Sequence, residues 1–262
     1  MSAPAPPPER DALVPWYRSW FGEEYLHLYP HRDQEEADQA VALLLRELED
    51  PRTGGCGGAG GRVLDLGCGA GRHLKALAEA GLRPVGMDLS LPLLREARRT
   101  APGCLRVRGD MRHLPFEEGS FDLVTSFFTS FGYFEADSED RKVLAEMDRV
   151  LGPGGRVFLD FLNAERVRAT LEPRDERIVD GKRVVQLRRL VDGGRRVEKR
   201  IRIRGKGVEE DFVERVRLYD AAELEALLGT VGLEVEARFG DYGGGPPGPA
   251  APREILLARR AT

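Results

Sequence analysis

Hydrophobic residues recur along this chain with two different periods, and the two alternate. Residues 62–66 (RVLDL), 83–88 (RPVGMD), 121–127 (FDLVTSF) and 155–162 (GRVFLDFL) are short apolar runs bounded by turn residues, as buried strands are. Residues 72–81, 90–99 and 137–151 show helical spacing between such runs. Strands that alternate with helices of this length predict right-handed βαβ units and a parallel sheet covered on both faces.

Residues 33–48 (DQEEADQAVALLLREL) predict a further helix before the first strand. Asp33 and Glu36 form a capping-box pattern, and apolar residues of the segment share one face. Residues 50–62 are so rich in glycine that they predict a flexible connection. We therefore expect an N-terminal helical extension, residues 1–50, which could act as a lid.

The pattern changes after residue 171. Turn signals at 180–181, 192–194 and 205–207 separate runs rich in Val, Ile, Arg and Lys, which predicts an antiparallel β-meander over residues 172–217. A helix capped by Asp220 and Glu223 follows, and residues 233–242 and 254–260 predict the last two strands. The meander is thus an insertion, and the α/β domain comprises residues 62–171 and 218–262.

Composition narrows the class of protein. With 262 residues, 41% of them hydrophobic, and a formal net charge of −4, the chain can bury a sizeable core and is not a general nucleic-acid or membrane-surface binder. Cys56, Cys68 and Cys104 form no CxxC pair, so we expect neither a disulfide framework nor a metal site. The N-terminus lacks a signal-peptide pattern, and no apolar run approaches the roughly 18 residues that span a bilayer. These features predict a cytoplasmic protein.

A glycine loop follows the first predicted strand. Gly67, Gly69 and Gly71 stand at every second position, with Asp65 still inside the strand. A dinucleotide fold would use G-x-G-x-x-G instead, so we expect another ligand at the carboxyl ends of the strands, where glycine lets the backbone approach it closely.

Five ordered blocks carry a family resemblance: VLDLGCGAG, VGMDLS, VRGDMRHLPFEEGSFDLVTSF, EMDRVLGPGG and RVFLDF. Together they resemble the class I S-adenosylmethionine-dependent methyltransferases of the bacterial small-molecule type. The resemblance implies a Rossmann-like seven-stranded sheet whose last strand is antiparallel. It also implies S-adenosyl-L-methionine as cofactor and S-adenosyl-L-homocysteine as product.

The resemblance also implies roles for single residues. Asp88 would accept both ribose hydroxyls, Asp110 would accept from the adenine amino group, and the amide of Met111 would face a ring nitrogen. The glycine loop would pass under the methionine part, oriented by Asp65, and Phe127 would present its backbone to the amino-acid end. The residues expected at the cofactor are Asp65, Gly67, Cys68, Gly69, Gly71, Asp88, Leu89, Asp110, Met111 and Phe127.

Residues 16–32 (WYRSWFGEEYLHLYPHR) concentrate aromatic side chains. Tyr25 and its neighbours could close over a sulfonium by cation–π attraction, and Arg32 could pair with the cofactor's carboxylate. The alternative is a helix that packs its aromatic side chains onto the sheet edge.

The implied reaction is an in-line displacement on the methyl carbon, which needs alignment and exclusion of water more than a catalytic residue. For a hydroxyl nucleophile, His31 and Tyr133 are candidate bases, with His27 and Asp241 behind them. Residues 125–135 (TSFFTSFGYFE) lack the Asn/Asp-Pro-Pro-Tyr/Phe box used for base or amide nitrogens. A small-molecule pocket that includes Tyr17, Ser130 and Tyr133 is the better expectation.

The meander carries 13 Lys or Arg against 6 Asp or Glu between residues 182 and 217, a local charge of +7 (13 minus 6). A solvated outer sheet face explains this, and so would an anionic substrate, an RNA or a dimer interface. We expect N- or O-methylation of a small molecule, with a homodimer possible and neither nucleic acid nor membrane as partner. The alternative is an RNA-directed methyltransferase or a cofactor-binding regulatory protein that uses the basic insertion; a dehydrogenase is more distant.

Overall fold

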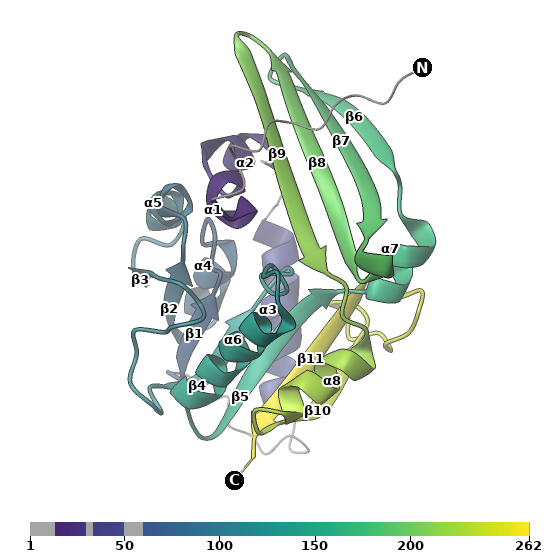
Figure 1. The fold of residues 1–262 in the computed structure, drawn as a ribbon. Helices are drawn as coiled ribbons and strands as arrows, with labels where there is room; N and C mark the ends of the chain where they lie inside the picture. The colour runs from purple at the N-terminus through teal and green to yellow at the C-terminus, as the bar shows by residue number, and fades with distance from the viewer. Residues whose placement is uncertain (1–13, 30–33, 50–59, 262) are drawn as a thin grey trace.

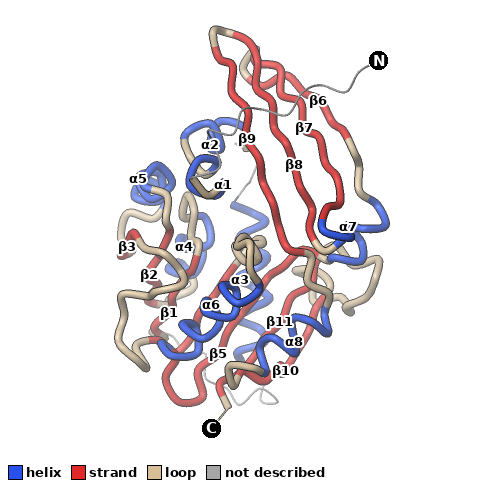
Figure 2. The backbone as a smooth tube through the Cα atoms, viewed as in Figure 1, coloured by secondary structure: helices blue, strands red, loops and turns tan. Residues whose placement is uncertain are grey.

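A seven-stranded sheet lies at the centre of the computed structural model, which describes residues 14–29, 34–49 and 60–261 (Figures 1 and 2). In spatial order its strands are β10 (Leu233–Phe239), β11 (Arg253–Arg260), β5 (Leu151–Leu162), β4 (Phe121–Ser126), β1 (Arg62–Leu66), β2 (Arg83–Asp88) and β3 (Leu105–Arg108). β11 pairs antiparallel with both of its neighbours, and the pairs from β5 to β3 are parallel. The last strand is therefore the antiparallel one, which confirms the predicted fold class.

Helices cover both faces of this sheet. α6 (Asp137–Val150) and α8 (Ala221–Gly229) bury their apolar side chains in a cluster with Leu64 and Leu256 on one face. α3 (Gln34–Glu49) and α4 (Arg72–Glu79) pack with Val63 and Phe158 on the other face. α5 (Leu91–Thr100) lies beside α4, β2 and β3. β1 is buried on both sides, which explains its nearly continuous apolar sequence.

The predicted meander is a second, four-stranded antiparallel sheet that follows α7 (Ala164–Thr170). Two of its turns have two residues with positive φ, Asp180–Gly181 and Lys206–Gly207, the geometry that matches the twist of a hairpin. The third turn is a short 3₁₀ segment, η3 (Asp192–Gly194). Its strands are β6 (Arg174–Val179), β7 (Lys182–Val191), β8 (Arg196–Gly205) and β9 (Val208–Arg217).

The N-terminal aromatic run forms two short helices, α1 (Trp16–Trp20) and α2 (Glu23–Leu28), which lie between β9 and α5 (Figure 1). Trp20 is fully buried with Ile201 and Ile203, and its ring centroid lies 5.0 Å from that of Phe212. The aromatic side chains thus pack on a face of the second sheet, not on the edge of the large sheet as the alternative expectation had it.

α3 also differs from the expectation. The sequence analysis grouped it with the N-terminal extension, but Leu43, Leu44 and Leu48 are buried against the seven-stranded sheet, so α3 is part of the α/β core. The predicted cap Asp33 and most of the glycine-rich connection, residues 50–59, lie outside the described residues. Among the helices of the described residues, none combines the length and apolar character that crossing a bilayer requires.

A buried carboxyl joins α6 to the segment between the two sheets. Asp140 is fully buried, its Oδ2 accepts a hydrogen bond from the Tyr219 hydroxyl at 2.8 Å, and its Oδ1 has no partner. Burial raises the pKa of Asp140 to about 7, although the Tyr219 hydrogen bond opposes this rise. The folded protein therefore holds this proton over a range of pH in which the unfolded chain has already lost it.

We expect Asp140→Asn to remove one source of instability at high pH. As pH rises from about 4 to about 7 the unfolded state loses the proton first, so this carboxyl lowers the free energy of unfolding. Between pH 5 and pH 8 the stability of wild type should fall by about 2–3 kcal/mol more than that of the variant. Urea unfolding of both proteins at the two pH values measures this difference, and parallel losses would refute the assignment.

Candidate active site

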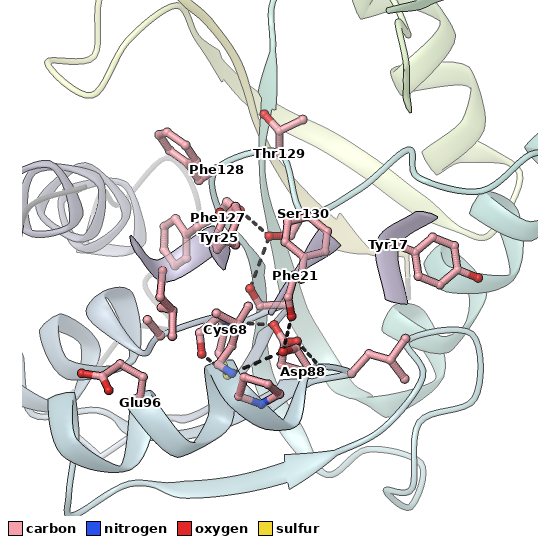
Figure 3. A pocket seen from close by; sticks show the side chains of 18 of the residues that line it. Tyr17, Phe21, Tyr25, Cys68, Asp88, Glu96, Phe127, Phe128, Thr129 and Ser130 are labelled. Atoms are coloured by element: carbon pink, nitrogen blue, oxygen red, sulfur yellow. Dashed lines mark hydrogen bonds between the residues drawn. The ribbon is translucent and has the colours of Figure 1, made fainter. Parts of the chain in front are cut away.

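A cleft with a volume of about 1010 Å³ lies at the carboxyl ends of β1 and β2, where an open parallel sheet presents its ligand sites. Its floor includes the glycine loop after β1 and the residues at the end of β2. α1, α2 and residues of β8 and β9 line it from the other side. Figure 3 shows side chains from both parts, Phe21 and Tyr25 on one and Cys68 and Asp88 on the other. One cleft therefore connects the two sheets.

The glycine loop has a left-handed backbone at each of its three glycines. Gly67, Gly69 and Gly71 have φ values of 77°, 53° and 86°. A Cβ on Gly67 would lie 2.6 Å from the Cβ of Ser130, and one on Gly71 would lie 2.9 Å from the Cβ of Ala97. A Cβ on Gly69 would meet nothing within 4 Å, and Gly69 lines the cleft. Gly67 and Gly71 thus serve the packing of the loop, and Gly69 leaves room for a ligand to approach the backbone.

Asp88 ends β2 and lines the cleft beside Leu89. Its Oδ2 accepts from the amide of Gly69 at 2.9 Å and its Oδ1 from the amide of Ser90 at 2.8 Å. Burial raises the pKa of Asp88, and these amide hydrogen bonds oppose the rise. Each carboxylate oxygen has two lone pairs, so both oxygens can still accept a hydrogen bond from a bound diol.

Asp65 lies beneath the loop and is not among the residues that line the cleft. Its side chain is buried, its Oδ1 accepts from the Thr125 hydroxyl at 3.3 Å, and no described residue donates to its Oδ2. Burial raises the pKa of this carboxyl to about 7. In this position Asp65 can support the turn from below. It could contact a ligand in the cleft only if the loop opened.

Asp110 and Met111 follow β3 and line the cleft. One edge of the Arg112 guanidinium holds both oxygens of the Asp110 carboxylate: Nε donates to Oδ1 at 3.0 Å and Nη2 to Oδ2 at 2.7 Å. These bonds lower the pKa of Asp110. The carboxylate is therefore ionised and oriented before any ligand arrives.

The turn after β4 forms the next part of the wall. Phe127 is buried and stacks on His73, with 4.2 Å between the ring centroids. Phe128 and Thr129 have φ values of 53° and 63°, which bulky and β-branched side chains seldom adopt. Phe128, Thr129 and Ser130 all line the cleft. Strained backbone at such a place must be held by its surroundings.

Asp160 of β5 holds this turn. Its Oδ2 accepts from the amide of Phe128 at 2.7 Å and from the Tyr242 hydroxyl at 2.7 Å, and its backbone carbonyl accepts from the amide of Thr129. The guanidinium of Arg253 donates to Oδ1 at 2.7 Å. The sequence analysis missed this group; the one available signal was a charged residue within the apolar run VFLDF.

Aromatic side chains form the other end of the cleft. The rings of Phe21 and Tyr133 stack with centroids 5.5 Å apart, and those of Tyr17 and Phe134 meet edge to face at 5.5 Å. Tyr25 lies against Phe21 at 5.0 Å. The predicted pocket residues Tyr17, Tyr133 and Ser130 and the predicted cofactor residue Tyr25 thus lie around the same cleft.

Four further residues were candidates for the site: His27, Asp241, His31 and Arg32. His27 lines the cleft, but its side chain is 61% exposed. Asp241 is not among the lining residues and accepts from the amide of Gly245. His31 and Arg32 lie outside the described residues.

His73 was not singled out by the sequence analysis. It lies in the first turn of α4, lines the cleft and is buried, and its Nε2 has no hydrogen-bond partner among the described residues. Burial keeps the pKa of His73 well below its ordinary value, so the imidazole is neutral. A buried nitrogen without a partner is a candidate contact for a ligand in this cleft.

The second sheet presents two different faces. Val197, Glu214 and Val216 line the cleft, and the strand register places them on the face that packs against α1 and α2. The pairs Arg202–Asp211 and Arg200–Val213 alternate with these positions along β8 and β9, so they lie on the opposite face. Arg200, Arg202 and Arg204 of β8 therefore point away from the cleft, whereas Lys199 of the same strand lies on the face toward α1 and α2.

Known proteins resemble this chain in sequence and in structure. Residues 63–155 match the family model described as "Methyltransferase domain". The chain is 35% identical over 203 residues to the cypemycin N-terminal methyltransferase of a Streptomyces species, which covers 76% of this chain and 82% of that protein.

Two solved structures extend the comparison. CalS10 of Micromonospora echinaspora, an amino pentose methyltransferase solved with S-adenosylmethionine bound, superposes with a TM-score of 0.66 at 26% identity and covers 91% of this chain and 97% of its own. An S-adenosylmethionine-dependent methyltransferase of Clostridium acetobutylicum superposes with a TM-score of 0.76 at 18% identity, over 91% of this chain and 98% of its own. The second likeness concerns the fold alone.

Proposed function

Because the chain belongs to the class I S-adenosylmethionine-dependent methyltransferases, we propose that it transfers the methyl group of this cofactor to an amine nitrogen of a small-molecule acceptor. S-adenosyl-L-homocysteine would be the second product. The observation that carries this proposal is the single cleft whose floor is the glycine loop with Asp88 and whose far end is lined by aromatic side chains. Cofactor and acceptor can therefore meet in one enclosed space.

The residues present fit the cofactor. Asp88 offers two oxygens with remaining lone pairs. Within the part of the chain that the structure describes, the space beside Gly69 is open and the buried Nε2 of His73 has no partner. We assign Asp88 and Leu89 to the ribose, Asp110 and Met111 to the adenine, and Gly67, Cys68, Gly69 and Phe127 to the methionine part. When bound, the cofactor supplies a methyl group on a positively charged sulfur.

The chain's own contribution is to orient the two reactants and to keep water out. Phe21 and Tyr133 stack across the cleft, and Ser90 donates a hydrogen bond to the carbonyl of Phe21, so the α1–α2 segment is tied to the start of α5. Correct alignment of this kind is worth about 7–11 kcal/mol in favourable cases. A neutral amine has a free lone pair and needs no general base, so Tyr133 would orient the acceptor rather than take a proton.

The names of the relatives favour nitrogen over oxygen as the atom that accepts the methyl group. The Streptomyces relative is named as an N-terminal methyltransferase and CalS10 as an amino pentose methyltransferase, so both names denote amine acceptors or amine-bearing ones. The acceptors differ in kind, a peptide terminus and a sugar, and the large cleft of this chain suits a molecule of such size.

Incubation of the pure protein with methyl-labelled S-adenosylmethionine and a cell extract tests this proposal. The extract is separated afterwards into small-molecule, peptide, protein and RNA pools. We expect label in the small-molecule pool, on a nitrogen that mass spectrometry identifies. Label confined to RNA, or on oxygen, would overturn the proposed acceptor.

Neutralising the basic outer face should leave turnover unchanged. The triple variant Arg200→Gln, Arg202→Gln and Arg204→Gln removes three charges from the face that points away from the cleft. We expect the rate of methyl transfer to stay within about 2-fold of wild type between 50 and 200 mM salt, whereas phosphate binding would weaken steeply over that range. A large loss confined to an RNA acceptor would favour the RNA-directed alternative.

A further inference from the structure

Glu214 is the one acidic side chain that the second sheet contributes to the cleft wall, within the described residues. It stands on β9 directly opposite Lys199 of β8, on the face that packs against α1 and α2. Its neighbours along the same wall are Val197 and Val216. Along β9, Glu214 stands between Val216 and Phe212 on this face, so a carboxylate interrupts a row of apolar side chains.

Two donors fix this carboxylate. Its Oε2 accepts from the indole Nε1 of Trp20 at 3.1 Å and from the ammonium of Lys199 at 2.5 Å. Lys199 is not among the residues that line the cleft, and its Nζ lies 3.5 Å from the hydroxyl of Tyr29. Within the described part of the chain no group donates to Oε1. Both donors therefore hold Oε2 from the sheet side, and Oε1 is left for a ligand.

The rest of the cleft also suits a cation. Tyr25 and Phe21 line the cleft and supply aromatic rings near Glu214. The ring of Tyr25 lies 5.5 Å from that of Trp20, whose indole donates to Glu214, and the ring of Phe21 lies 5.0 Å from that of Tyr25. Among the described residues, the charged side chains that line the cleft are five carboxylates and three guanidiniums, a net charge of −2 (three minus five). They are Glu23, Asp88, Glu96, Asp110 and Glu214 against Arg72, Arg95 and Arg99. Aromatic rings beside a carboxylate are the combination that recognises alkylammonium groups.

We propose that Glu214, together with the aromatic rings, forms a subsite for an alkylammonium group of the acceptor. This inference rests on the proposed amine acceptor and names the chemical class that the far end of the cleft selects. Glu214 acts here in binding and specificity. The subsite holds the protonated amine, which must lose its proton to solvent before its lone pair attacks the methyl carbon, or the methylated ammonium product. A hydroxyl or thioether acceptor of the same shape would lack the charge that Glu214 recognises.

Choline and its uncharged carbon isostere 3,3-dimethylbutan-1-ol test the subsite. The chain has two tryptophans, and Trp20 hydrogen-bonds to Glu214, so tryptophan fluorescence reports on this end of the cleft. With S-adenosylhomocysteine saturating, we expect choline to bind about 10-fold more tightly than the alcohol, and Glu214→Gln to reduce this preference to within about 2-fold.

Glu210→Gln is the matched control, because Glu210 lies on the same strand and the same face but does not line the cleft. It should keep the full preference for choline. Equal affinity for choline and the alcohol in wild type, no choline binding up to 100 mM, or an unchanged preference in Glu214→Gln would each overturn the subsite.

The labelled-extract experiment separates the two proposals. If an amine is methylated and Glu214→Gln still prefers choline, the subsite is wrong and the proposed function stands. If Glu214→Gln loses the preference but no amine acquires label, the subsite stands and the proposed methyl acceptor is wrong.

Discussion

Replacing Asp88 with alanine is expected to weaken S-adenosylmethionine binding by about 100-fold or more, with the fold retained. The carboxylate lines the cleft, and its two oxygens are already oriented by the amides of Gly69 and Ser90. Loss of two hydrogen bonds to a charged group, each worth about 1.5–3 kcal/mol, predicts a change of this size. Isothermal titration calorimetry with S-adenosylmethionine and with S-adenosylhomocysteine measures it.

Asp122→Asn provides the control for this experiment. Asp122 also lies on a strand of the large sheet, but its side chain is 43% exposed and pairs with Arg62, away from the cleft. Its replacement should leave ligand affinity unchanged. If Asp88→Ala is folded by circular dichroism and binds within about 3-fold of wild type, the assignment of Asp88 to the ribose is wrong.

Replacing Asp160 with alanine is expected to cost about 3–5 kcal/mol in the free energy of unfolding. The variant leaves the guanidinium of Arg253 and the amide of Phe128 without their acceptor in a buried site. For a chain of this length the loss corresponds to a fall in Tm of about 6–20 °C. Urea denaturation and differential scanning calorimetry measure both quantities, and Asp122→Asn should lose no more than about 1 kcal/mol.

A double variant separates the contribution of the Asp160–Arg253 ion pair to the free energy of unfolding from its effect on the cleft. Asp160→Ala with Arg253→Leu removes both partners, so no buried charge is left alone, and part of the lost stability should return. The amide of Phe128 would still lack its acceptor, whereas the amide of Thr129 keeps the backbone carbonyl of residue 160. We therefore expect Asp160→Ala to lower cofactor affinity, and the double variant to keep this low affinity. Recovery of stability and affinity together would show that Asp160 acts on the fold alone.

The fold was predictable because each of its elements has a local signal. The apolar runs of β1, β4 and β5 are buried on both faces and read as continuous hydrophobic segments. The turns at Asp180–Gly181 and Lys206–Gly207 contain a glycine, and Asp220 and Glu223 form the capping box of α8 that their spacing suggested. Local signals of this kind need no knowledge of distant residues.

The candidate site was predictable where a single block of sequence holds it. Gly69, Asp88 and Asp110 each stand at the end of a strand or just after it, and parallel strands bring such ends to one edge of the sheet. Asp65 stands before its strand ends, so alternation turns its side chain away from the cleft. That difference depends on the exact register, which the spacing alone left open.

By itself the sequence determined the order of strands and helices, the glycine loop with its acidic residues, and the kind of protein that these blocks resemble, because each depends on neighbours a few positions apart. Only the tertiary structure decided that α3 belongs to the core, that Asp160 and Arg253 hold the turn at Phe128, and that Glu214 faces the cleft while the arginines of β8 face away from it. These arrangements join residues that are far apart along the chain, and a strand in a sheet can place a given side chain on either face until its partners set the register.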